Sequence, residues 1–143
     1  MKSFLLTICT LLAFAPALAQ EEKSDFELIT QTIQYYLDGT SQDKPELIKK
    51  AFHPDLNLYA INNDGSLRVW PGVDYISNFK GGNPNNRIGK ILSIDIENNT
   101  AQAKASIEYP DDRPYMFIDY FMLLKIEGQW KIVHKMYTRI PKS

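Results

Sequence analysis

Residues 115–126 read YMFIDYFMLLKI, and the turn Glu127-Gly128 joins them to residues 129–137, QWKIVHKMY. The first run is apolar at nearly every position, as in a central strand that is covered on both faces. In the second run apolar and polar residues alternate, which is typical of a strand with one buried face. The two runs and their Glu-Gly turn therefore predict a hairpin at the centre of a sheet.

Four further strands are predicted outward from this hairpin. Residues 101–109 alternate small or apolar side chains with polar ones, and residues 87–96 precede them across the turn Asn98-Asn99. Earlier in the chain, the segments 56–61 and 67–70 flank Asn62-Asn63-Asp64-Gly65, a sequence that favours a hairpin turn. The C-terminal half is thus a run of consecutive strands.

Three helices are predicted in the N-terminal half. The first begins at Ser24 or Asp25, carries apolar residues at helical spacing and ends at Asp38-Gly39. The second spans 46–52, with Asp43 as its cap and Pro45 in its first turn, and the third spans 73–79. Helices followed by antiparallel strands indicate an α+β domain whose helices pack on one face of a curved antiparallel sheet. A binding site is then expected between the helices and the sheet.

The first residues read as a cleavable export signal. Lys2 precedes an apolar stretch from Phe4 to Phe14, and Ala17-Leu18-Ala19 offers small residues two apart. The stretch is too short for a stable membrane anchor, and Cys9 lies inside it, so a lipid-attachment box is rejected. We predict a signal peptide over 1–19, a single domain over 24–140 and export to a bacterial periplasm or the extracellular space. A buried N-terminal helix is the alternative interpretation.

Several stretches resemble the nuclear transport factor 2-like superfamily, the cone-shaped fold of ketosteroid isomerase and polyketide cyclases. Within it, the chain is similar to the bacterial putative lumazine-binding family. The resemblance rests on residues 33–39 (IQYYLDG), 50–55 (KAFHPD), 87–94 (RIGKILSI), 117–125 (FIDYFMLLK) and 128–133 (GQWKIV). It implies a conical pocket, often a homodimer, and a pteridine-like ligand, whereas the fold itself hosts many unrelated activities.

Three residues are candidates for catalysis. Asp119 lies within an apolar strand, where a carboxylate needs a partner or its pKa rises, and the resemblance implies acids of this kind as proton carriers. The alternatives for Asp119 are an edge or bulge position in the strand, or an ion pair with an arginine such as Arg68 or Arg113. His134 shares the apolar face of the last strand but is equally a core residue. His53 stands beside a proline and is equally a helix C-terminal residue.

Aromatic residues are the candidates for a cavity wall that suits a small apolar or flat heterocyclic ligand. Ordinary core packing is the alternative for many of them. The predicted lining is Tyr36, Tyr59, Trp70, Tyr75, Phe79, Tyr120 and Met136. Two histidines and one cysteine predict no metal site, and no phosphate-loop motif suggests a nucleotide cofactor. A net charge of −1 argues against nucleic acid as a partner.

The sequence thus favours an exported small-ligand-binding or accessory domain, with no cofactor, no membrane contact after cleavage and a homodimeric assembly. The alternative is a cofactor-independent isomerase or cyclase that uses Asp119 or a pocket histidine as general base. A third interpretation is a module whose open sheet face serves only for association. The discriminating feature is geometric, because an enzyme requires Asp119 and at least one of Tyr36, His53 and His134 to meet at one cavity.

Overall fold

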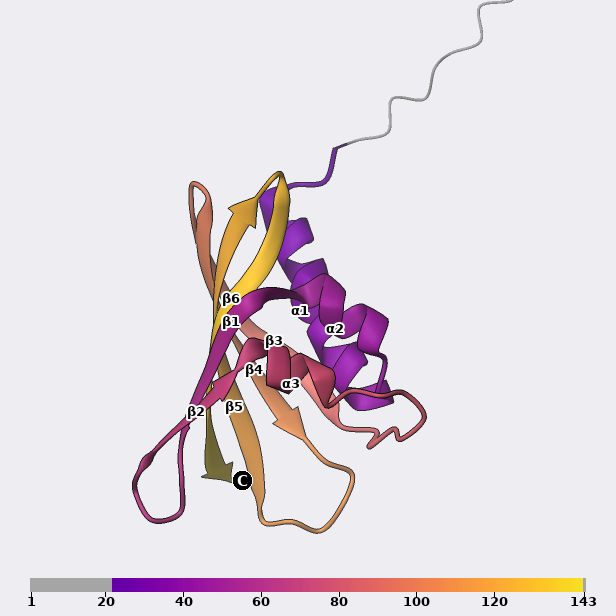
Figure 1. The fold of residues 1–143 in the computed structure, drawn as a ribbon, viewed down its shortest axis with the longest axis vertical. Coiled ribbons are helices and arrows are strands. Elements are labelled where there is room, and N and C mark those ends of the chain that lie inside the picture. Colours follow the sequence, from indigo (N-terminus) through magenta and orange to yellow (C-terminus); the bar gives the residue numbers. More distant parts are fainter. Residues whose placement is uncertain (1–21, 143) are drawn as a thin grey trace, which may run out of the picture.

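The computed structural model describes residues 22–142 and consists of three helices packed on one face of a curved six-stranded sheet (Figure 1). The predicted signal peptide, 1–19, lies outside the described residues. The predicted α+β architecture is confirmed. The elements in chain order are α1 (Asp25–Gln42), α2 (Pro45–Ala51), β1 (Phe52–Ile61), β2 (Leu67–Pro71), α3 (Gly72–Ser77), β3 (Ile88–Glu97), β4 (Thr100–Glu108), β5 (Tyr115–Ile126) and β6 (Gln129–Pro141).

Helix α1 begins as predicted but ends later. Ser24 and Glu27 form a reciprocal capping box, in which the Ser24 backbone N–H donates to Glu27 Oε2 at 2.8 Å. Gly39 does not end the helix, which continues to Gln42. Glycine at this position instead allows α2 to pack closely on α1, because a Cβ there would come within 2.9 Å of Ile48 Cδ1. The left-handed end residue is Asp43, at φ 52°, and the predicted role of Asp43 as the cap of α2 is therefore wrong.

The sheet is mixed, not wholly antiparallel as predicted. Its strand order is β2-β1-β6-β5-β4-β3, and β1 pairs with β6 in parallel while every other neighbouring pair is antiparallel. The chain reaches the second edge of the sheet through α3 and residues 78–87, and it returns strand by strand to β1. The last strand therefore lies between the first strand and the rest of the sheet.

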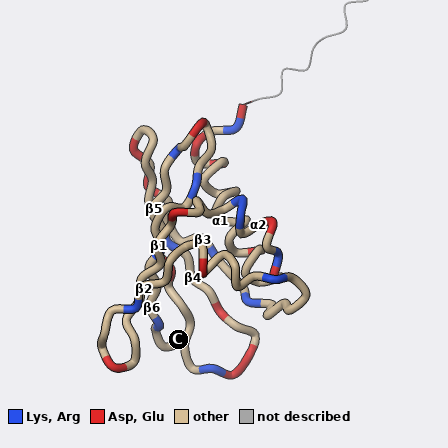
Figure 2. Tube along the Cα trace, in the orientation of Figure 1, with Lys and Arg blue, Asp and Glu red and all other residues tan. Residues whose placement is uncertain are grey.

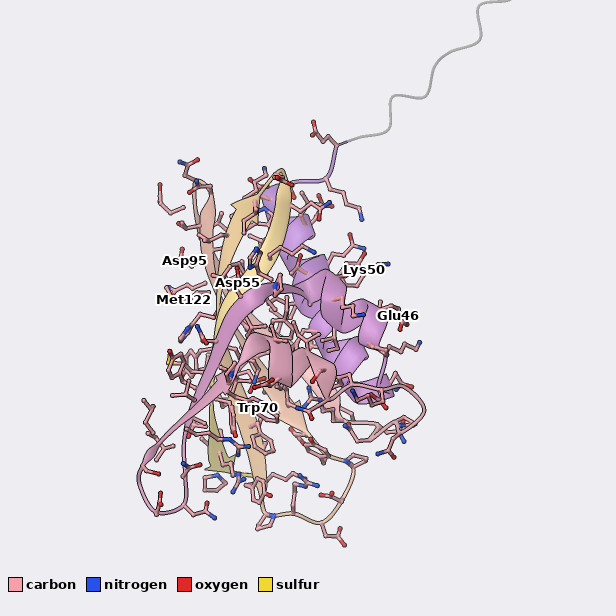
Figure 3. All side chains as sticks on the ribbon, in the orientation of Figure 1. Glu46, Lys50, Asp55, Trp70, Asp95 and Met122 are labelled. Carbon is pink, nitrogen blue, oxygen red and sulfur yellow. The ribbon has the colours of Figure 1, made fainter. Side chains whose placement is uncertain are left out.

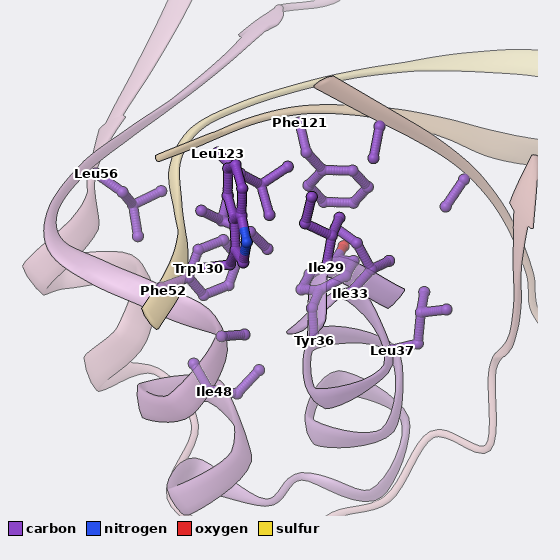
Figure 4. Close-up of a cluster of buried hydrophobic side chains, with 14 of the residues drawn as sticks. Ile29, Ile33, Tyr36, Leu37, Ile48, Phe52, Leu56, Phe121, Leu123 and Trp130 are labelled. Atoms are coloured by element: carbon purple, nitrogen blue, oxygen red, sulfur yellow. The ribbon is translucent and has the colours of Figure 1, made fainter. Parts of the chain in front are cut away.

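The hydrophobic core fills the space between the helices and the concave face of the sheet (Figure 4). Tyr36 on α1 lies at its centre, with its ring edge-on to Phe52 at 5.5 Å and to Phe121 at 5.1 Å between centroids. Helix α3 also approaches β1 closely at Gly72. A Cβ on this residue would come within 2.5 Å of the Leu56 carbonyl oxygen, so the close packing requires glycine. This contact holds α3, with Tyr75, against β1.

The outer face of the sheet is exposed, although the sequence of β5 predicts a strand covered on both faces. Asp119, Phe121 and Leu123 point into the core, whereas Met122 is 58% exposed and Tyr120 is 42% exposed. Figure 3 shows Met122 on the side of the sheet opposite the helices. β5 therefore carries apolar residues on both faces, as predicted, but among residues 22–142 only the inner face is covered.

Acidic and basic residues are interspersed along the described chain, with no long run of one sign (Figure 2). None of the helices within residues 22–142 has the length and apolar character needed to cross a membrane.

Candidate functional site

Three polar side chains meet inside the apolar core. The hydroxyl of Tyr36 donates a hydrogen bond to Oδ2 of Asp119, and Nζ of Lys135 lies 2.9 Å from the same oxygen. Asp119 is only 2% exposed and Lys135 only 3%. Both side chains project from the concave face, Asp119 from β5 and Lys135 from β6. A buried carboxylate thus has both a cationic partner and a neutral donor, as buried charge requires.

The direction in which the Lys135 side chain points depends on a β-bulge in β6. Met122 pairs with His134 and Leu123 with Ile132, so Val133 has no opposite residue on β5. The side-chain alternation reverses at this point, because the period of a strand is two residues. Lys135 therefore points toward the helices, whereas regular alternation from Trp130 would have placed His134 there.

The same bulge corrects two sequence-based interpretations. His134 is directed to the outer face, where its ring stacks on Tyr59 with centroids 4.9 Å apart. Met136 is exposed on that face as well. The expected ion pair of Asp119 with Arg68 or Arg113 is also wrong, since Arg113 pairs with Asp111 at 2.6 Å and Arg68 lies over the ring of Trp70.

The polar trio borders a cavity of about 220 Å³ between α1, α3 and the sheet. One acidic and three basic side chains line it, together with aromatic rings and aliphatic residues. The lining is Tyr36, Leu58, Trp70, Tyr75, Arg87, Ile107, Tyr109, Phe117, Asp119, Lys135, Tyr137 and Arg139. The cavity therefore combines flat apolar walls with a charged floor, which suits a small organic molecule carrying polar substituents.

The predicted lining residues divide between three places. Tyr36, Trp70 and Tyr75 line the cavity with Asp119. Phe79 packs edge-on to Tyr75 at 5.4 Å but borders a separate groove with Phe52 and Pro54. Tyr59, Tyr120 and Met136 belong to the outer face, because side chains alternate along a strand and these three lie next to residues that point inward.

His53 is absent from the residues that line the cavity. It stands at the start of β1, where its Nδ1 accepts a hydrogen bond from the backbone N–H of Asp55 at 3.2 Å. This contact holds the His53 ring against the backbone at the start of β1. Within residues 22–142, no group of three or more His, Cys, Asp or Glu side chains is placed to hold a metal ion.

Burial shifts the ionisation of several cavity residues. Burial and the neighbouring charge of Asp119 raise the pKa of Tyr36 well above its usual value. Burial raises the pKa of Tyr75 to about 12. Burial lowers the pKa of Lys135, and the attraction of Asp119 opposes this shift only in part. The phenols therefore remain hydrogen-bond donors at neutral pH, while Lys135 gives up its proton more readily than a surface lysine.

Sequence reasoning missed Lys135 and Arg87. A signal for Lys135 was present, because the consecutive apolar residues Ile132 and Val133 break the alternation of the strand. For Arg87, at the entry to β3, no local pattern indicated that its side chain turns toward the cavity. Both residues depend on contacts with distant elements, which is why spacing along the chain did not reveal them.

We predict that Asp119→Asn lowers the free energy of unfolding by about 3 kcal/mol at pH 7, because it leaves the Lys135 charge buried without its partner. Chemical denaturation measures this loss. The double variant Asp119→Asn/Lys135→Met is expected to recover most of it. The control is Lys125→Met, which breaks the solvated 2.8 Å pair with Asp25 and costs less than about 1 kcal/mol.

The loss in Asp119→Asn also depends on pH. Because the pKa of folded Lys135 lies below the 10.5 of an unperturbed lysine, the unfolded chain binds more protons between these two values. Stability therefore rises with pH in this window, and it rises more in Asp119→Asn, where no carboxylate holds the proton on Lys135. The difference in the free energy of unfolding between Asp119→Asn and the unsubstituted protein should therefore shrink from pH 7 toward pH 10.5. A constant difference would contradict the assigned burial of the pair.

Comparison with known proteins places this fold among nuclear transport factor 2-like proteins. Such a protein of unknown function from Shewanella baltica OS155 superposes with a TM-score of 0.72 at 23% identity, over 82% of this chain and 95% of that one. Another, from Methylobacillus flagellatus KT, gives a TM-score of 0.69 at 27% identity, over 81% of this chain and 92% of that one.

A curated relative and a family model extend the comparison to sequence. The aldolase FrzH from Cladobotryum sp is 25% identical over 122 residues, which are 83% of this chain and 94% of the relative. The model of the family described as putative lumazine-binding matches residues 24–138, from the capping serine of α1 through most of β6. This chain therefore belongs to the putative lumazine-binding family, within the nuclear transport factor 2-like superfamily.

Proposed function

We propose that this chain is an exported domain that binds a small, flat organic molecule in the cavity between α1, α3 and the sheet. The observation that carries the proposal is the buried trio of Tyr36, Asp119 and Lys135 at the border of an aromatic-walled cavity. A buried ion pair is weak support for stability alone, so its position beside a cavity favours a role in recognition. The family description supports a ring system of the lumazine type.

Export is the part of this proposal that rests on residues 1–19 alone. Cleavage after Ala19 predicts a mature chain that begins at Gln20. Expression of the full-length gene in a bacterial host, followed by N-terminal sequencing of the periplasmic fraction, tests it. An intact Met1 on the recovered protein would contradict cleavage.

Binding is tested by thermal shift and calorimetry with lumazine and a panel of flat heterocycles, together with native mass spectrometry of the purified protein. We expect at least one compound to co-purify or to raise the melting temperature. Asp119→Asn and Tyr75→Phe should each weaken its binding, because the first removes a negative charge from the cavity and the second removes a hydroxyl group. The matched control is Asp95→Asn, an exposed acid on β3 that Gln102 contacts at 3.2 Å (labelled in Figure 3). Equal binding by all three variants, or no binding to the unsubstituted protein, would overturn the proposal.

A second candidate function is cofactor-independent proton abstraction next to a carbonyl. It is favoured because Asp119 and Tyr36 border the same cavity and Asp119 does not face bulk solvent. In such a step the substrate C–H bond breaks, the proton moves to Asp119, and the electron pair moves to the carbonyl oxygen. Lys135, whose ammonium group has donors beyond the one directed at Asp119, can donate a hydrogen bond to the oxyanion that forms. The name of the Cladobotryum relative, an aldolase, is consistent with carbonyl chemistry.

Deuterium exchange into aryl ketones such as acetophenone, followed by NMR in D₂O, distinguishes an enzyme from a binding domain. An enzyme is expected to accelerate exchange at the carbon next to the carbonyl, and Asp119→Asn should abolish the acceleration while Asp95→Asn keeps it. Exchange at the buffer rate in the unsubstituted protein would leave ligand binding as the function and exclude these ketones as substrates.

We also propose that two copies associate through the outer face of the sheet. Its exposed apolar side chains come from β1, β5 and β6 and include Tyr120, Met122 and Met136. Sedimentation velocity should give a dimer, and Met122→Glu should shift it to the monomer because a charge would be buried at the contact. Gln42→Glu, on an exposed position of α1, serves as the control. A monomer at all concentrations would contradict the proposal.

A further inference from the structure

The amino end of Lys135 lies at the cavity. Its Nζ is 2.9 Å from Oδ2 of Asp119, 4.9 Å from the centroid of the Tyr137 ring and 5.4 Å from the centroid of the Tyr36 ring. These three neighbours line the cavity together with Lys135 itself. Only 4% of the Lys135 side chain is exposed. The nitrogen therefore borders the cavity and is shielded from bulk water.

An amine in this position can lose its proton to a neighbour. Burial disfavours the ammonium form and lowers the pKa of Lys135. The carboxylate of Asp119 is the base that can receive the proton, and the Tyr36 hydroxyl holds the same carboxylate in place. Neutral lysine attacks carbonyl carbon, and enzymes obtain the neutral amine by desolvation or with an adjacent base. Both conditions meet at this nitrogen.

Two other lysines show that neither an ion pair nor burial alone creates this environment. Nζ of Lys125 lies 2.8 Å from Oδ1 of Asp25, but 35% of its side chain is exposed, so water stabilises its charge. Burial lowers the pKa of Lys131 as well, but its Nζ donates to the Lys50 carbonyl oxygen at 2.7 Å, and Lys131 is absent from the cavity lining. Lys135 combines burial, a carboxylate and a cavity.

We propose that Lys135 is a nucleophile that forms an imine with a small planar aldehyde in this cavity. The inference goes beyond the proposed function, because it assigns a covalent bond to one side chain of the chain. The aromatic walls, including Trp70 and Tyr75, contact the ring of the aldehyde. The cavity volume of about 220 Å³ admits roughly one or two rings.

The reaction conserves atoms and charge. Lys135 passes a proton to Asp119, and its nitrogen lone pair attacks the carbonyl carbon, whose π electrons move to the oxygen. A second proton then moves from nitrogen to this oxygen. Asp119 returns its proton to the new hydroxyl group, the C–O bond breaks and one water leaves. The product is a protonated imine beside an ionised Asp119, so the buried positive charge keeps its partner.

Reductive trapping tests the inference, because sodium cyanoborohydride reduces imines faster than aldehydes near neutral pH. The purified protein is treated at pH 7 with benzaldehyde or 2-naphthaldehyde and the reductant, and peptide mapping by mass spectrometry locates the adducts. We expect Lys135 to react at least about tenfold faster than Lys125 and Lys131, since lysine reacts in its deprotonated form. Equal rates at the three lysines would overturn the inference. Mapping also separates the adduct on the α-amino group, which deprotonates near neutral pH.

A charge-matched variant identifies the reacting amine. Lys135→Arg keeps a positive charge beside Asp119 but cannot form an imine, so the fast phase of labelling in the intact mass should disappear. Lys125→Arg is the matched control and should keep the fast phase. Circular dichroism checks that both variants are folded. A fast phase that persists in Lys135→Arg would assign the reaction to another amine, and the inference would fail.

A competition experiment needs no variant. 2-Naphthalenemethanol has the ring of 2-naphthaldehyde but no carbonyl group, so it occupies the cavity without reacting. It should slow the labelling of Lys135 in the unsubstituted protein and leave the labelling of Lys125 unchanged. An equal effect on both lysines, or no effect on either, would contradict imine formation inside the cavity.

The outcomes separate this inference from the proposed function. If Lys135 shows no preferential labelling, and a heterocycle still binds in dependence on Asp119 and Tyr75, the covalent assignment is wrong and the binding function remains. If Lys135 is labelled preferentially, and no heterocycle binds up to millimolar concentration, the binding function is wrong and this inference stands. If neither is observed, both are wrong.

Discussion

The ion pair between Asp119 and Lys135 is the interaction on which the interior of this protein depends. It joins β5 to β6 beneath α1, and the hydroxyl of Tyr36 attaches the helix to the same carboxylate oxygen. Charges buried this deeply are tolerated only when each has a partner, so the three side chains constrain one another. Helix α1 must place the Tyr36 hydroxyl within hydrogen-bonding distance of Asp119, and β6 must bulge at Val133 so that Lys135 faces inward. The remaining core packs around these constraints.

The same sheet has two faces with different chemistry. The concave face carries the polar trio, the cavity and Arg87, and helices cover it. The outer face carries exposed apolar residues such as Met122, and no element of residues 22–142 packs over it. β5 supplies both faces, because alternate side chains of one strand point in opposite directions. Its uniformly apolar sequence therefore supplies the core on one face and an exposed apolar surface on the other.

Much of the architecture could be predicted from local patterns. The alternation in residues 101–109, the capping box at Ser24 and Glu27, and the Asn-Asp-Gly turn after β1 depend on neighbours a few residues away, and the corresponding elements are present. Tyr36, Trp70 and Tyr75 were identified because aromatic residues suit a cavity wall, but the same reasoning also selected Tyr59 and Tyr120, which lie on the outer face. The parallel pairing of β1 with β6 could not be predicted, since it joins segments far apart in the chain. The partner of Asp119 was missed for the same kind of reason, because a single unpaired residue at Val133 reverses every side chain that follows.

The insertion of the last strand between the first strand and the rest of the sheet also governs how the chain can assemble. Phe52 pairs with Ile132, so this contact closes a loop of about eighty residues, and the entropy of closing such a loop is lost before the contact forms. Until β6 is in place, the β1–β2 hairpin has no sheet to join, and the β3–β5 meander has an unpaired edge on β5. Folding is thus expected to be slow for a chain of this size and to leave an unpaired strand edge exposed until β1 pairs with β6. Because only Glu127 and Gly128 join β5 to β6, Asp119 and Lys135 belong to one local hairpin, and it is the docking of β1 on β6 that must wait for the long closure.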